Sequence, residues 1–156
     1  MKILGIDPGS GIVGFGCIEI TKNTPKLVGA GVIRTTIGDE DSSRLVELFD
    51  SMVELLEEFK PDIAVVEKLF FAQNVTTAMK VSQARGVILL AIEKAGVKFE
   101  EYTPLQIKMA MTGYGRATKA QIQELVRIQL GLKEKPKPDD CADALAAALT
   151  HSNQVR

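Results

Sequence analysis

The order of the apolar segments constrains the fold of this chain more than any other feature of its sequence. Three segments rich in β-branched residues (2–7, 12–20 and 26–36) follow one another with only short connections between them. Pro8 to Gly11 and Lys22 to Pro25 supply turn-forming residues at those connections. Consecutive strands joined in this way pair in opposite directions, so the chain is predicted to open with an antiparallel meander.

The rest of the chain alternates helical and strand patterns. Asp41 to Ser43 give an N-cap signal, and apolar residues then recur at three- and four-residue spacing up to Phe59. Further strands are expected at 62–67 and 97–103, and helices at 77–95, 104–111, 118–130 and 139–150. This order predicts one α/β domain over residues 1–156, with a five-stranded mixed sheet and helices on both faces.

Composition excludes several classes of protein. The chain has 46% hydrophobic and 25% charged residues and no run of eighteen apolar residues, so we expect a soluble protein with no membrane partner. Its N-terminus lacks the features of a signal peptide, which favours the cytoplasm. One histidine and two distant cysteines, Cys17 and Cys141, exclude a structural zinc site and predict two reduced, buried thiols. Any bound metal must be held by carboxylates, which favours Mg²⁺ or Mn²⁺.

Charge is unevenly distributed along a chain whose net charge is only −1. Residues 39–62 carry nine acids and two bases, whereas residues 102–137 carry seven bases and two acids. The second segment is consistent with a locally basic face that binds nucleic acid, and equally with the solvated surface of ordinary helices.

Gly9, Gly11 and Gly14 match the G-x-G-x-x-G spacing of a dinucleotide-binding loop. Such a loop opens a helix whose N-terminus binds the phosphates, but these glycines open the strand-like segment 12–20. Asp7, two residues before the first of them, would also repel a pyrophosphate. We therefore expect no nucleotide cofactor and interpret Asp7 as the functional residue of the motif.

Four acids are candidates for a shared metal site. Asp7 and Glu67 each end an apolar strand, where side chains emerge at the edge of the sheet. Asp140 and Asp143 lie three residues apart at the start of the last predicted helix, and so share one helix face. Helix capping explains Asp140 equally well, but Asp143 lies one turn further in. Close carboxylates repel one another and normally imply a bound cation, and this set suits two Mg²⁺ ions beside a phosphodiester.

Four segments together resemble the RuvC family of Holliday junction resolvases, over essentially the whole chain. They are GIDPGSGIVGFG (5–16), VVEKLFFAQN (65–74), QARG (83–86) and DDCADALAAALTH (139–151). The resemblance implies a ribonuclease H-like fold and a homodimer with two active sites. It also implies Mg²⁺-dependent cutting of two like strands of a four-way DNA junction, leaving 5′-phosphate and 3′-hydroxyl ends, in recombination and repair. The RuvA and RuvB branch-migration proteins are the partners that it implies.

The same resemblance assigns roles to individual residues. The catalytic acids and ligands of two metal ions would be Asp7, Glu67, Asp140 and Asp143, with Asp7 between the metals.

Other residues would contact the DNA. Phe70 would stack at the opened centre of the junction, and Lys108 and Lys119 would lie near the scissile phosphate. Arg85 lies in a matching segment and would bind DNA, support the dimer or form an ion pair on its helix. The glycines at positions 9, 11 and 14 would let a DNA backbone approach the first acid.

Two further features concern assembly and the metal site. Residues 87–92 are apolar on every side of their predicted helix, which favours burial against the sheet on one side and a second subunit on the other. His151 falls on the Asp140 face of the last helix, but about 16 Å further along it. We therefore expect His151 at the surface or in a tail, and not as a ligand.

Three other functions stay open on the sequence alone. The acid cluster also suits another ribonuclease H-like nuclease, one that acts on RNA. The D-x-G of Asp7 to Gly9 is shared with sugar-kinase and actin-like phosphate binders, which need two such domains to enclose ATP where this chain has room for one. A junction-binding module without catalysis would need no acid cluster.

Overall fold

The first three strands form the antiparallel meander that the sequence predicts. In the computed structural model, which describes residues 1–68 and 74–155, β1 (Lys2–Asp7) pairs with β2 (Ile12–Thr21), and β2 pairs with β3 (Thr24–Arg34). Lys22 and Asn23 join β2 to β3 with φ values of 52° and 62°. A two-residue turn with positive φ at both positions matches the twist of paired strands, so it fixes their register.

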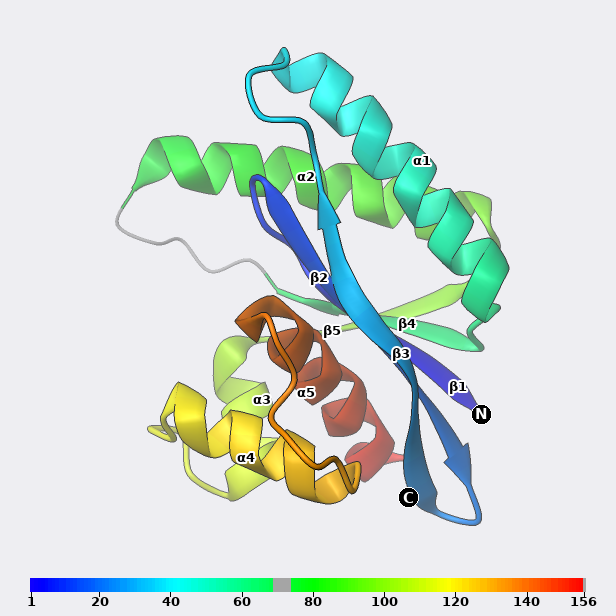
Figure 1. Ribbon diagram of the computed structural model, residues 1–156, viewed down its shortest axis with the longest axis vertical. Helices are drawn as coiled ribbons and strands as arrows, with labels where there is room; N and C mark the ends of the chain where they lie inside the picture. The colour runs from blue at the N-terminus through cyan, green and yellow to red at the C-terminus, as the bar shows by residue number, and fades with distance from the viewer. Residues whose placement is uncertain (69–73, 156) are drawn as a thin grey trace.

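Two parallel strands complete the sheet. β4 (Ile63–Glu67) pairs with β1 and β5 (Lys98–Tyr102) pairs with β4, which gives the order β3-β2-β1-β4-β5. One face is covered by α1 (Asp41–Phe59) and α2 (Val75–Lys94), and the other by α3 (Pro104–Thr112), α4 (Lys119–Gln129) and α5 (Asp139–Gln154) (Figure 1). The predicted mixed sheet with helices on both faces is confirmed.

Alternation along the strands separates the core into two layers. Leu4, Ile6 and Val66 pack against α1 and α2, whereas Ile3 and Val65 face α3, α4 and α5. Successive strand residues point to opposite faces. The last residues of β1 and β4 continue the second series, so they emerge on the side of α5.

The backbone of α5 lies directly against β1 and β2, because these strands present glycines to it. A Cβ at Gly5 would overlap the carbonyl oxygen of Ala144, and a Cβ at Gly14 would overlap the carbonyl oxygen of Asp140. A Cβ at Gly16 would lie 2.5 Å from side-chain carbons of Leu145. Gly5 and Gly14 therefore set the height of α5 above the sheet, and Gly16 makes room for the side chain of Leu145.

Two local predictions are wrong. The N-cap of α1 is Glu40, whose side chain makes no cap hydrogen bond, so Asp41 to Ser43 already lie in the first turn. His151 is buried, with 8% of its surface exposed, and its Nδ1 lies 2.9 Å from the hydroxyl of Tyr102. The error arises because α5 continues to Gln154 and carries His151 beneath the end of β5. The two cysteines are free and buried, as predicted.

Tyr102→Phe is expected to destabilise the protein, because it leaves Nδ1 of His151 buried without its partner. Burial lowers the pKa of His151, so the ring is neutral and depends on this bond near pH 7. We expect a loss of about 1–3 kcal/mol in the free energy of unfolding, measured by urea titration. Tyr114→Phe, at a side chain that is mostly exposed, is the control. Equal effects of the two changes would contradict the prediction.

Candidate active site

Three elements bring the four predicted acids to one edge of the sheet. Asp7 ends β1 and Glu67 ends β4, and these two strands are parallel neighbours. Asp140 and Asp143 occupy the first turns of α5, which lies across the same strands. Gly14 is the strand partner of Asp7 and touches the backbone of Asp140, so it links the first acid to the third.

The acids alter one another's protonation. The pKa of Asp7 is raised to about 8, first by burial and then by the charges of Glu67, Asp143 and Asp140. Burial and the charge of Asp143 also raise the pKa of Glu67. A hydrogen bond between Asp7 and Glu67 stabilises the proton on Asp7 and the charge on Glu67. The site thus disfavours several negative charges at once, which is the condition that a bound cation relieves.

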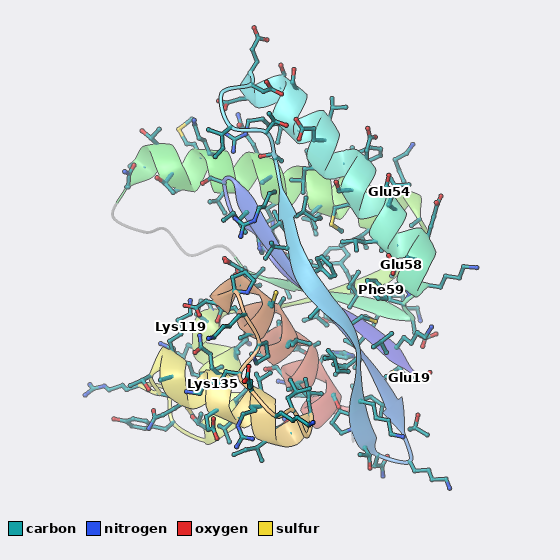
Figure 2. The ribbon with its side chains drawn as sticks, in the orientation of Figure 1. Glu19, Glu54, Glu58, Phe59, Lys119 and Lys135 are labelled. Carbon is teal, nitrogen blue, oxygen red and sulfur yellow. The ribbon has the colours of Figure 1, made fainter. Side chains whose placement is uncertain are left out.

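Lys119 inserts a positive charge among these acids. It extends from the first residue of α4 (Figure 2). Its Nζ lies 3.0 Å from Oδ2 of Asp143 and 3.7 Å from Oδ2 of Asp139. Burial alone would lower the pKa of Lys119, but the hydrogen bond and the charge of Asp143 outweigh burial and raise it. A capping box between Thr118 and Gln121 fixes the turn from which Lys119 extends. An ammonium group held in this way shows that the cluster attracts cations.

Two hollows adjoin the acids, and Glu67 and Pro104 line both. The first, of about 210 Å³, also contacts Asp7, Lys68 and Arg85. The second, of about 230 Å³, is lined by the basic side chains Lys108 and Lys119 together with Asp143. The predicted lysines therefore lie beside the acids.

Arg85 fastens α2 to the sheet behind the acids. Its guanidinium forms an ion pair with Glu101 of β5, and both side chains are largely buried. The sequence left three roles open for Arg85, and the structure shows one of them, an ion pair. The partner, Glu101, lies on a strand and not on the same helix as expected.

The acids fit a hard divalent metal ion by their chemistry. All four offer carboxylate oxygens, the ligands that Mg²⁺ prefers. Burial, together with neighbouring negative charge, raises the pKa of Asp7, Glu67 and Asp143. Within residues 1–68 and 74–155, no three acids, cysteines or histidines lie close enough together to form a finished metal centre. Asp143 instead contacts Lys119. The chain therefore supplies the carboxylate ligands, and their side chains must rotate before they can surround a metal ion.

Comparison with known proteins shows the family of this chain. The family model described as crossover junction endodeoxyribonuclease RuvC matches residues 3–151. The chain belongs to the RuvC family. The Brevibacillus brevis crossover junction endodeoxyribonuclease RuvC is 55% identical over 152 residues, which cover 97% of this chain and 92% of the relative. The Petrotoga mobilis enzyme of the same name is 51% identical, with 98% and 94% covered.

Solved RuvC structures share the whole fold. The Thermus thermophilus RuvC structure superposes with a TM-score of 0.93 at 36% identity, covering 100% of this chain and 96% of that one. Thermus thermophilus RuvC in complex with a Holliday junction substrate gives a TM-score of 0.91 at 34% identity, with the same coverage. The ribonuclease H-like fold that the resemblance implied is confirmed.

Contacts within the chain limit which residues can replace the glycines of the RuvC-like first motif. Gly14 is buried, and its contact with α5 accounts for it without DNA. A Cβ at Gly11 would lie 3.0 Å from Nη2 of Arg44. Gly9 and Gly11 are partly exposed, so close approach of DNA stays a prediction for them. Phe70 lies outside the described residues.

Arg44 of α1 is a residue beside the candidate active site that the sequence does not single out. Its Nε donates to Oγ1 of Thr35 at 2.9 Å, and its Nη2 donates to the carbonyl of Ser10 at 3.3 Å. It therefore holds the loop that follows Asp7. One arginine on an amphipathic helix carries no sequence signal for such a role, because both partners come from distant segments.

Asp7→Asn is expected to flatten the pH dependence of stability when metal is absent. The pKa of Asp7 is about 8 in the folded chain and 3.8 as the ordinary value, so the folded state retains a proton that the unfolded state releases between these values. Stability must therefore fall as pH rises through this window. Urea unfolding in EDTA should show Asp7→Asn gaining at least about 1 kcal/mol over the native protein at pH 8, and much less at pH 4.

Asp50→Asn, at an exposed position on α1, is the control for this measurement. Parallel stability curves for the native protein and Asp7→Asn would contradict the prediction.

Proposed function

We propose that this chain is a Holliday junction resolvase, a single nuclease domain that hydrolyses phosphodiesters in two like strands of a four-way DNA junction. Membership of the RuvC family supports this, as does the likeness to Thermus thermophilus RuvC solved with a Holliday junction substrate. The observation that carries the proposal is the group of acids around Asp7: burial and the charges of these neighbours raise the pKa of Asp7 to about 8. Such a site is built to receive a cation and, through it, a phosphodiester.

We assign a divalent metal ion as the cofactor, Mg²⁺ in the cell, with two ions per active site. Asp7, Glu67, Asp140 and Asp143 would hold the ions. Bound metal supplies Lewis-acid activation of water and of the leaving oxygen. The chain itself supplies the frame, because the ends of β1 and β4 and the first turns of α5 fix where the four carboxylates stand.

The basic residues beside the acids would bind the DNA backbone. Lys108 and Lys119 line the hollow that also holds Asp143, so a phosphate in that hollow would meet two ammonium groups. A phosphate bound there would draw Lys119 from Asp143 to the substrate, which would free Asp143 to hold a metal ion. Arg85 and Lys68 line the other hollow, beside Asp7, and would bind an adjoining phosphate. From the family resemblance, Phe70 would stack on a base at the junction centre.

A second copy of the chain would pack against α2. Val75, Met79 and Leu90 are 71%, 63% and 53% exposed, and there is open space beyond Gly86. These four positions share one face of the helix. Within the described residues, α2 alone is long and apolar enough to pass for a membrane-spanning helix. Its other face packs on α1 and the sheet, so burial on one side and a partner subunit on the other explain this composition.

Two like strands require two active sites, and a homodimer provides them with matching symmetry. The RuvA and RuvB branch-migration proteins are the further partners that we infer from the family resemblance. We place the reaction in the bacterial cytoplasm, where chromosomal DNA recombines.

Asp7→Asn is expected to abolish cutting and to preserve binding. The substrate is a synthetic mobile four-way junction in Mg²⁺, with a duplex of the same sequence and an RNA–DNA hybrid for comparison. Losing one metal ligand should slow junction cutting by at least about 100-fold, while gel-shift affinity in EDTA is unchanged. Asp50→Asn should cut normally. Preferential cutting of the hybrid would instead favour the ribonuclease alternative, and persistent cutting by Asp7→Asn would exclude the proposed mechanism.

Leu90→Glu is expected to convert a dimer into a monomer, because it places a charge in the apolar face of α2. Light scattering after size exclusion at micromolar concentration measures the mass. Ile128→Glu is the matched control, since Ile128 is 56% exposed on α4 and lies outside the α2 face. A monomeric native protein, or a dimeric Leu90→Glu variant, would refute the proposed interface.

A further inference from the structure

Gly14 meets the part of α5 that carries an acid. It is the strand partner of Asp7 and is buried. A Cβ at this position would overlap the carbonyl oxygen of Asp140, and would lie 2.5 Å from its carbonyl carbon and 2.9 Å from its Cβ. Every one of these three nearest atoms belongs to Asp140 itself.

These atoms cannot yield by rotating a side chain. Two belong to the backbone of the first turn of α5, and the third is the Cβ from which the carboxylate extends. The next turn is held as well, because the carbonyl of Ala144 rests on Gly5 and Leu145 is fully buried. An added methyl group must therefore lift the start of α5 away from the sheet. Ordinary contacts begin at 3.4 Å, so Asp140 would have to move by about 1 Å.

We propose that Gly14 is a positioning residue for hydrolysis. Because Gly14 has no side chain, the first turn of α5 packs closely on β2, and this places Asp140 at the height above Asp7 that the shared cation site requires. This inference rests on the proposed function, because it takes Asp140 to be one of the metal-binding acids. It gives Gly14 a role in positioning an acid, distinct from leaving room for DNA.

Gly16 provides a matched control on the same strand and under the same helix. A Cβ there would meet Cγ and Cδ2 of Leu145 at 2.5 Å, and its nearest backbone atom, the Leu145 nitrogen, would be 3.3 Å away. This overlap falls on the side chain of Leu145, five residues beyond Asp140, so Gly16→Ala should strain the core around Leu145 and leave Asp140 in place. Both alanine variants should lower the melting temperature, but only one should displace an acid.

The experiment compares Gly14→Ala, Gly16→Ala and the native protein in three measurements. These are thermal melting, junction binding in EDTA, and single-turnover junction cutting across a Mg²⁺ titration. For Gly14→Ala we expect native affinity for the junction in EDTA, cutting slowed about 100-fold and a several-fold higher Mg²⁺ requirement, because a 1 Å misplacement at a reacting centre has effects of this size. Manganese binding without DNA, followed by electron paramagnetic resonance, should weaken in parallel.

Gly16→Ala should cut within a few-fold of the native rate at the same Mg²⁺ concentration. Equal cutting and equal metal dependence for the two variants would overturn the inference while leaving the resolvase function intact. A native protein that does not cut junctions would instead overturn the proposed function.

Asp140→Glu provides a second route if Gly14→Ala does not fold. This variant keeps Gly14 and therefore the position of α5. The glutamate side chain is one methylene longer, so only the carboxylate moves. A higher Mg²⁺ requirement and weaker manganese binding in Asp140→Glu would support the positional requirement. A metal dependence equal to that of the native protein would overturn it.

Discussion

The close contact between the backbone of α5 and the glycines of β1 and β2 is the constraint on which the rest of the structure depends. Gly5 and Gly14 leave room for the carbonyls of Ala144 and Asp140, so the helix lies lower on the sheet than side chains would allow. Glycine in a strand costs conformational entropy and buries little surface. The alanine-rich face of α5, buried almost completely, offsets this cost. The result is a fixed distance between the end of β1 and the start of α5.

That distance brings together groups that repel one another. Burial and neighbouring charges raise the pKa of Asp7, Glu67 and Asp143, so the folded chain is strained at neutral pH by its own site. Lys119 relieves part of this repulsion at Asp143. A divalent ion would relieve more, because two charges on one small centre can meet several carboxylates together. The repulsion makes the folded chain less stable without a cation. A cation that removes the repulsion would bind more tightly by the same free energy, as expected of a functional site.

The sequence predicts the elements of this fold because their signals are local. Apolar runs and helical spacing lie within each segment, and acids at strand ends emerge at a sheet edge, which correctly anticipates that Asp7 and Glu67 adjoin. The error at His151 concerns a contact between distant segments, whereas the N-cap of α1 is only shifted along the chain, to Glu40. His151 is buried because Tyr102, 49 positions away, offers a hydrogen bond. Gly14 is explained by Asp140 and Arg44 by Ser10, and no periodicity within one segment reveals either pairing.

α2 couples the proposed dimer face to the active site through adjacent residues. Gly86 lies on the exposed apolar face, and its neighbour Arg85 points the other way, to Glu101 on β5 and to the hollow beside Asp7. A helix bound on one side by a second subunit loses freedom to tilt, so its contacts on the other side become more rigid. Dimerisation would therefore do more than supply a second site for the second strand. It would also hold Arg85, and with it the wall of the hollow beside Asp7, in a fixed position against the sheet.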